Sequence, residues 1–128
     1  MATIEEALFT RLTEFAETAA LLGTRVYPLA VPQDAAMPAL AYQRISGSPA
    51  YSHDGFSNLS RARFQMTCQA DTYARVKALA AAVRHCWDGF KGTVEDIDLV
   101  AFIENELDST SEAPVVRLDV RLLHNATD

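Results

Sequence analysis

One segment, residues 61–90, changes its hydrophobic period from that of a strand to that of a helix. In residues 61–70 every second side chain is apolar, which predicts a strand with one face against a core. Asp71 and Thr72 then offer oxygen atoms for a helix N-cap, and the apolar residues that follow have helical spacing. The helical stripe comprises Val76, Leu79, Ala80, Val83, Cys86, Trp87 and Phe90. A strand followed by a helix that can cover its apolar face predicts a two-layer α+β domain.

The N-terminal region predicts a second helix. Thr3 and Glu6 have the spacing of a capping box, and apolar residues recur with helical period from Ile4 to Leu22. Gly23 is the expected residue to end this helix.

The remaining elements are predicted to be strands. Residues 39–46, 97–107 and 115–124 have strand patterns, and residues 25–27 fit a short edge strand. The alternation in residues 39–46 is imperfect, so the sequence does not show which face of this strand is buried. Val100 and Phe102 give the strand over residues 97–107 a second apolar face, which suggests cover on both sides. Gly89 and Gly92 are expected to bracket a turn before that strand.

These elements follow the order α-β-β-α-β-β within a single domain, residues 1–128. The simplest arrangement is an about four-stranded, mostly antiparallel sheet with two helices packed on one face. The polar residues of residues 61–70 and 115–124 would then cover the other face, where they could meet a neighbouring subunit through charge pairs.

Composition and charge narrow the function classes. The sequence has no apolar run near the ~20 residues of a membrane helix, and Glu5 and Glu6 stand where a signal peptide would be basic. We therefore expect a chain that is not in a membrane and that stays in the cytosol or joins an assembly made there. The net charge of −6 argues against binding driven by DNA phosphates, although it is compatible with a channel through which DNA passes. Cys68 and Cys86 are predicted to be buried, reduced thiols.

No motif predicts catalysis. The sequence lacks C-x-x-C, H-E-x-x-H, a P-loop and a dinucleotide-binding glycine pattern, so we expect no enzyme activity, metal site or cofactor. His53 and Asp54 could serve as a general base and its orienting group, but no nucleophile accompanies them. An acidic stretch is predicted to form a solvated or lumen-facing edge; it contains Glu95, Asp96, Asp98, Glu104 and Glu106.

Residues 47–58 are predicted to be a loop at the upper limit of ordinary length, and such loops are often functional. Tyr51 and Phe56 stand among polar residues there. Either the segment is a hairpin whose aromatic side chains pack on their own strands, or it is a projecting arm whose aromatic side chains anchor a partner. The sequence favours neither alternative.

The order and spacing of several segments resemble the small tail-completion or tail-terminator proteins of long-tailed phages, prophages and gene transfer agents. The resemblance covers nearly the whole chain. It rests on Gly23–Pro28, Pro38–Ser46, Tyr51 with Asp54-Gly55, Arg61–Gln65, Tyr73, Ala78-Leu79 and Asp88–Gly92.

This resemblance implies a structural virion protein that forms a ring, typically a hexamer, at the head-proximal end of the tail tube. Such a ring ends tube growth, joins tail to head, and has a central channel for double-stranded DNA. The implied partners are further copies of the chain, the tail-tube protein and a head-closure or connector protein, assembled in the bacterial cytoplasm. The candidate interface residues are Tyr51, His53, Asp54, Phe56, Arg61, Arg63, Arg117 and Arg121. The alternatives are the adjacent head-closure ring protein and, more remotely, a small-molecule-binding domain that uses His53 and Asp54.

If residues 47–58 form an arm, replacing Tyr51 and Phe56 by Ser should leave the monomer folded and weaken assembly, because anchor residues contribute to binding and not to the core. Circular dichroism and light scattering measure the two effects. An unfolded double variant would instead place both aromatic side chains in the core.

Overall fold

The computed structural model describes residues 3–49, 60–95, 97–109 and 114–124. The elements in these ranges are α1 (Ile4–Glu14), α2 (Ala16–Leu22), β1 (Val26–Pro28), β2 (Ala39–Pro49), β3 (Ser60–Gln69), α3 (Tyr73–Trp87), β4 (Lys91–Val94), β5 (Ile97–Ser109) and β6 (Val115–His124). None of the helices in these ranges is both long enough and apolar enough to span a membrane.

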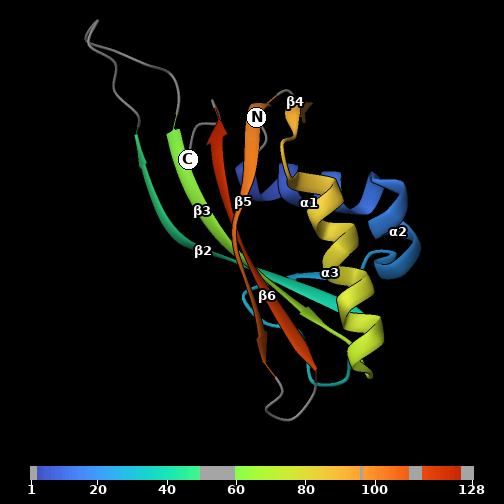
Figure 1. Cartoon of the computed structure of the whole chain (residues 1–128). Helices are drawn as coiled ribbons and strands as arrows, with labels where there is room; N and C mark the ends of the chain where they lie inside the picture. The colour runs from blue at the N-terminus through green and yellow to red at the C-terminus, as the bar shows by residue number, and fades with distance from the viewer. Residues whose placement is uncertain (1–2, 50–59, 96, 110–113, 125–128) are drawn as a thin grey trace, which may run out of the picture.

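The strands form one sheet in the order β1-β2-β3-β6-β5-β4. β1 pairs with β2 in parallel, and the other neighbours are antiparallel. The three helices lie on one side of the sheet (Figure 1). The prediction of an about four-stranded sheet with two helices is therefore wrong, because the described residues form a six-stranded mixed sheet with three helices. The short strand β4 occupies the segment that was expected to be a turn, and its four residues carry too little pattern to reveal it.

The predicted N-terminal helix is in fact two helices, because Phe15 has an extended backbone with ψ 127°. The break removes the regular hydrogen-bond partner of the Leu12 carbonyl. Thr18, which is fully buried, donates from Oγ1 to that carbonyl oxygen at 2.6 Å. A buried hydroxyl thus satisfies the carbonyl that the break leaves unpaired.

The strand–helix unit that dominates the sequence is confirmed. Each predicted apolar position of residues 61–70 is at most 2% exposed. The Thr72 hydroxyl accepts from the Arg75 backbone N–H at 3.2 Å, so Thr72 is the N-cap of α3. α3 ends at Trp87, and Phe90 follows a glycine with φ +73°. The Phe90 ring packs edge-on against Trp87 at 6.1 Å between centroids.

Bulges in β2 and β5 explain why the apolar and polar residues of these two strands do not alternate regularly. The register shifts between Arg44 and Ser46 in β2 and between Ile103 and Asn105 in β5. Each extra residue moves the following side chains to the opposite face. In β5, Phe102 is 45% exposed, so the expected cover on both faces is absent at that position of the described chain.

Cys68 and Cys86 are free and buried, as predicted. Burial raises the pKa of both thiols to about 12. Both side chains belong to the core cluster between the sheet and the helices.

We expect Thr18→Val to lower the free energy of unfolding by about 1–3 kcal/mol, because it leaves the buried Leu12 carbonyl without a donor. Thr18→Ser keeps the hydroxyl and is the matched control. Urea unfolding measures both variants. Equal losses in the two would show that packing of the methyl group, and not the hydrogen bond, stabilises the break.

Candidate subunit interface

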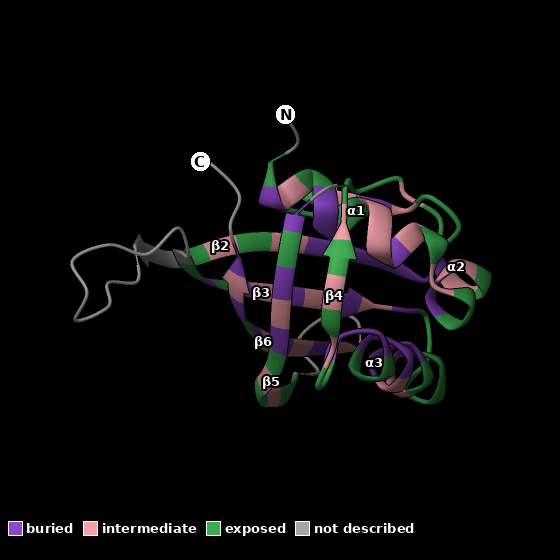
Figure 2. Cartoon of the chain, turned by 90° about the horizontal axis from the view of Figure 1, so that it is seen from above, coloured by how far each residue is buried: buried purple, intermediate pink, exposed green. Residues whose placement is uncertain are grey.

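The sheet has one face that none of the described helices covers, here called the helix-free face. Buried and more exposed residues alternate along β5 in Figure 2, and the same alternation holds in β3 and β6. Because the apolar residues of β3 and β6 face the helices, their polar neighbours project from the opposite side. All four predicted interface arginines outside the loop lie there: Arg61 and Arg63 on β3, Arg117 and Arg121 on β6.

Two of these arginines face each other across the sheet. Arg63 and Arg121 are direct partners in the β3–β6 register. Glu104 of β5 forms ion pairs with both, at 3.7 Å from Arg63 Nε and 3.0 Å from Arg121 Nη2. Asp119 lies 3.3 Å from Arg63 Nη2. These carboxylates offset the repulsion that two facing cations would otherwise cause.

The other two arginines form no ion pair within the described part of the chain. Arg61 lies opposite Leu123, and Arg117 lies between Thr67 and Leu107 in the register. Arg61 is exposed and Arg117 is half-buried. Two cations of the helix-free face are therefore available to an external carboxylate.

The predicted acidic stretch does not form one edge within the described residues. The bulge in β5 leaves Glu104 on the helix-free face and turns Glu106 toward the helices. Glu106 pairs with Lys77 at 3.0 Å and with Arg84 at 2.9 Å. The bulge has no clear signal in the sequence, so the opposite orientations of these two glutamates could not be predicted.

Asp108 follows Glu106 on the helix side of β5 and binds residues of α3. Tyr73 Oη donates to Asp108 at 2.7 Å, and Lys77 Nζ lies 3.4 Å from it. The tyrosine hydrogen bond and then the lysine lower the pKa of Asp108. The hydrogen bond to Asp108 raises the pKa of Tyr73, and the hydrogen bond to Glu106 raises the pKa of Lys77. This cluster is an intrachain link between α3 and β5 that the sequence did not indicate.

Glu95 and Asp98 of the acidic stretch lie next to β4. Glu95 accepts from Thr10 Oγ1 at 3.0 Å, and Asp98 accepts from Thr93 Oγ1 at 2.6 Å. Asp96 lies outside the described residues, as do Tyr51, His53, Asp54 and Phe56. The interface role of all these residues stays a prediction.

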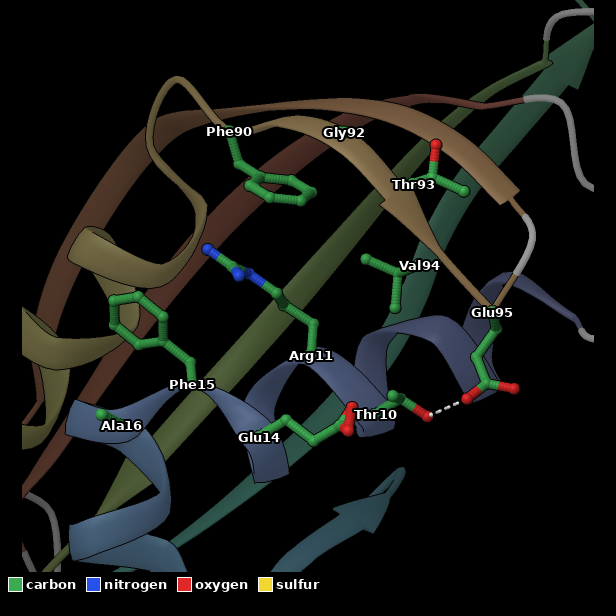
Figure 3. A pocket seen from close by; sticks show the side chains of 10 residues that line it. All are labelled: Thr10, Arg11, Glu14, Phe15, Ala16, Phe90, Gly92, Thr93, Val94 and Glu95. Atoms are coloured by element: carbon green, nitrogen blue, oxygen red, sulfur yellow. Dashed lines mark hydrogen bonds between the residues drawn. The ribbon is translucent and has the colours of Figure 1, made fainter.

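A hollow of about 690 Å³ lies between α1 and β4 (Figure 3). The Arg11 guanidinium stacks between the Phe15 and Phe90 rings, at 4.8 and 4.1 Å from their centroids. Its Nη2 donates to the Cys86 carbonyl at 3.0 Å, near the C-terminal end of α3. Arg11 therefore links α1 to α3, and this packing role is sufficient to explain why its side chain is half-buried. Among the described residues no group of three His, Cys, Asp or Glu side chains could hold a metal ion.

We expect Glu104→Gln to lower the free energy of unfolding by less than about 1 kcal/mol, because it leaves Arg63 and Arg121 facing each other at an exposed site. The loss should shrink at high salt, where exposed charges are screened. Urea unfolding at low and high salt measures it. Glu14→Gln is the control, since Glu14 is an exposed carboxylate with no ion pair among the described residues. A loss independent of salt would contradict the electrostatic account.

The chain is similar to proteins of known structure. The chain is similar to a protein in a solved structure of the virion of a native gene transfer agent particle, with 25% identity and a TM-score of 0.67. The match covers 95% of this chain and 92% of that one. A second solved structure is 18% identical with a TM-score of 0.66, covers 98% of this chain and 95% of its own, and supports the fold alone. No curated protein matches.

Residues 6–121, most of the chain, match the family of the tail completion protein gp17. The resemblance seen in the sequence is thereby confirmed. The chain belongs to the tail completion protein gp17 family, which gives it a structural role in a phage-type tail.

Proposed function

We propose that the protein forms a ring, as a hexamer, at the head-proximal end of the tail, where it ends growth of the tail tube and joins the tail to the head. The observation that carries this proposal is the family match over residues 6–121, together with the similarity to a protein of a gene transfer agent virion. A tail that must stop at one length and accept one head needs a final subunit with two different surfaces.

The helix-free face supports a charged contact with a neighbouring protein of the tail. Cations on an exposed sheet face can meet the carboxylates of such a partner. Arg61 and Arg117 have no ion pair in the described part of the chain and are candidates for that contact. Arg63 and Arg121 are already paired within the chain, but exposed pairs are worth only about 0–1 kcal/mol and can exchange partners.

Net charge supports a channel through which DNA passes without specific binding. The chain carries −6, and a lumen of negative potential repels the phosphate backbone. Glu95, Asp96 and Asp98 are our candidates for the lumen or a lateral edge. The partners in this proposal are the tail-tube protein on one side and a head-closure protein on the other, with assembly in the bacterial cytoplasm.

Deleting the gene from a particle-producing cell tests the proposal. We expect tails of uncontrolled length without heads, because tube subunits would keep adding to an unblocked end. Electron microscopy measures tail length, and a plasmid copy of the gene is the control.

The same micrographs distinguish a tail-terminating ring from the main alternative, the adjacent head-closure ring. Tails of normal length that fail to attach to heads would instead indicate the adjacent head-closure ring. Infectious or transducing particles with normal, joined tails would contradict both positions.

A further inference from the structure

The sheet has two strands whose outer edges are only partly covered. β4 pairs with β5 from Ile97 to Val100, and the backbone of residues 89–90 extends the cover to Ala101. β1 pairs with β2 from Leu40 to Tyr42. Among the described residues, no strand covers the outer edge of β5 over residues 104–109 or that of β2 over residues 43–49. These two segments are called the open edges.

The open edges lie at opposite ends of the sheet. β2 and β6 run in the same direction, and β5 runs against both, as the pairings from β2 to β3, β6 and β5 require. Each open edge is the C-terminal part of its strand. In Figure 1 the end of β2 accordingly rises at the upper left, whereas β5 ends at the bottom of the view. A second copy placed beside the first would bring β2 next to β5 in antiparallel orientation.

One backbone N–H at the open edge of β5 is directed away from β6. The Ile103 N–H points outward, to the Asp88 carboxylate at 3.5 Å. Ile103 lies opposite Val120 and Glu106 lies opposite Leu118, two residues along β6, so the Glu106 N–H points to the same side. It donates at 3.0 Å to the side-chain oxygen of its neighbour Asn105. An outward N–H held only by a local side chain can exchange that partner for the carbonyl of an added strand. Proteins usually shorten or cover long open edges, because such edges pair with other chains.

Side chains favour pairing of unlike edges over pairing of like edges. The open edge of β5 carries three carboxylates, Glu104, Glu106 and Asp108, so two copies of β5 would place like charges opposite each other. The open edge of β2 carries one charged residue, the cation Arg44, which pairs with Glu5 at 3.5 Å, so no run of like charges opposes the carboxylates of β5 there. Each open edge also carries one large exposed apolar residue, Ile45 on β2 at 45% and Leu107 on β5 at 55%.

We propose that the open edge of β5 in one subunit pairs antiparallel with the open edge of β2 in a second copy, which makes the sheet continuous around the ring. This inference rests on the proposed ring. A sheet closes on itself only when its strands tilt and the register is staggered at each step. Open edges at opposite ends of the sheet supply such a stagger, and the pairing brings Ile45 near Leu107.

Crosslinking tests this pairing. The double variant Ile45→Cys/Leu107→Cys is produced in cells that lack the native copy, and purified particles are oxidised and run on a non-reducing gel. We expect a ladder of linked subunits, because cross-strand cysteines on paired edges lie within disulfide range. The native Cys68 and Cys86 are buried and do not compete.

The single variants are the matched controls. Neither Ile45→Cys nor Leu107→Cys alone can link subunits that pair β2 with β5. Dimers of Leu107→Cys alone would show pairing between two β5 edges and overturn the inference. Particles that contain the double variant but yield no ladder would overturn the edge pairing and leave the ring proposal standing. Absence of the wild-type protein from particles would overturn the proposed function itself.

A backbone variant gives a second readout. Glu106→Pro and Glu106→Ala both remove the contacts with Lys77 and Arg84, but only proline removes the outward N–H. We expect both variants to fold, by circular dichroism, and the proline variant to enter particles about tenfold less than the alanine variant. Equal incorporation would contradict the edge pairing. If the proline variant fails to fold, the crosslinking of the double cysteine variant is the test of the edge pairing.

Discussion

Burial of one face of the β3–β6 pair beneath the helices is the contact on which the rest of the structure depends. Met66 pairs with Leu118 and Phe64 with Val120 across these two strands, and all four side chains are fully buried. The apolar stripe of α3 completes the same core. Because side chains alternate along a strand, committing one face to the core commits the other to polar residues. The helix-free face with its four arginines is the consequence.

The bulge in β5 then decides how charge is distributed over the molecule. Without it, Glu104 and Glu106 would share a face, since both stand at even positions of one strand. With it, Glu104 neutralises two facing arginines on the helix-free face, and Glu106 holds α3 through Lys77 and Arg84. One inserted residue thus converts a run of carboxylates into two separate sets of ion pairs. Arg61 and Arg117 are left without a carboxylate in the described chain.

A tail protein of this size needs surfaces more than it needs a pocket. The hollow between α1 and β4 is organised around Arg11, whose stacking and hydrogen bonds serve the packing of α1 against α3. The open edges of β2 and β5, by contrast, have no evident purpose in a monomer. Family membership and the similarity to a gene transfer agent virion protein fit a molecule whose open strand edges lie at the two sides of its sheet, where another protein can contact them.

Local pattern by itself determined β3, β6, α3, the capping box of α1 and the burial of both cysteines, because each depends on a period or a motif within a few residues. The sequence also carried the family resemblance. Tertiary structure alone decided the break at Phe15, the strand β4 and the two bulges. Each of these features depends on a residue far away in the sequence or on a single inserted residue. Backbone hydrogen bonds with Ala101 hold the segment that leads into β4, and the bulges are visible only in the pairing of β2 with β3 and of β5 with β6. The number of strands and the direction of each glutamate follow from those long-range pairings, which no local period can express.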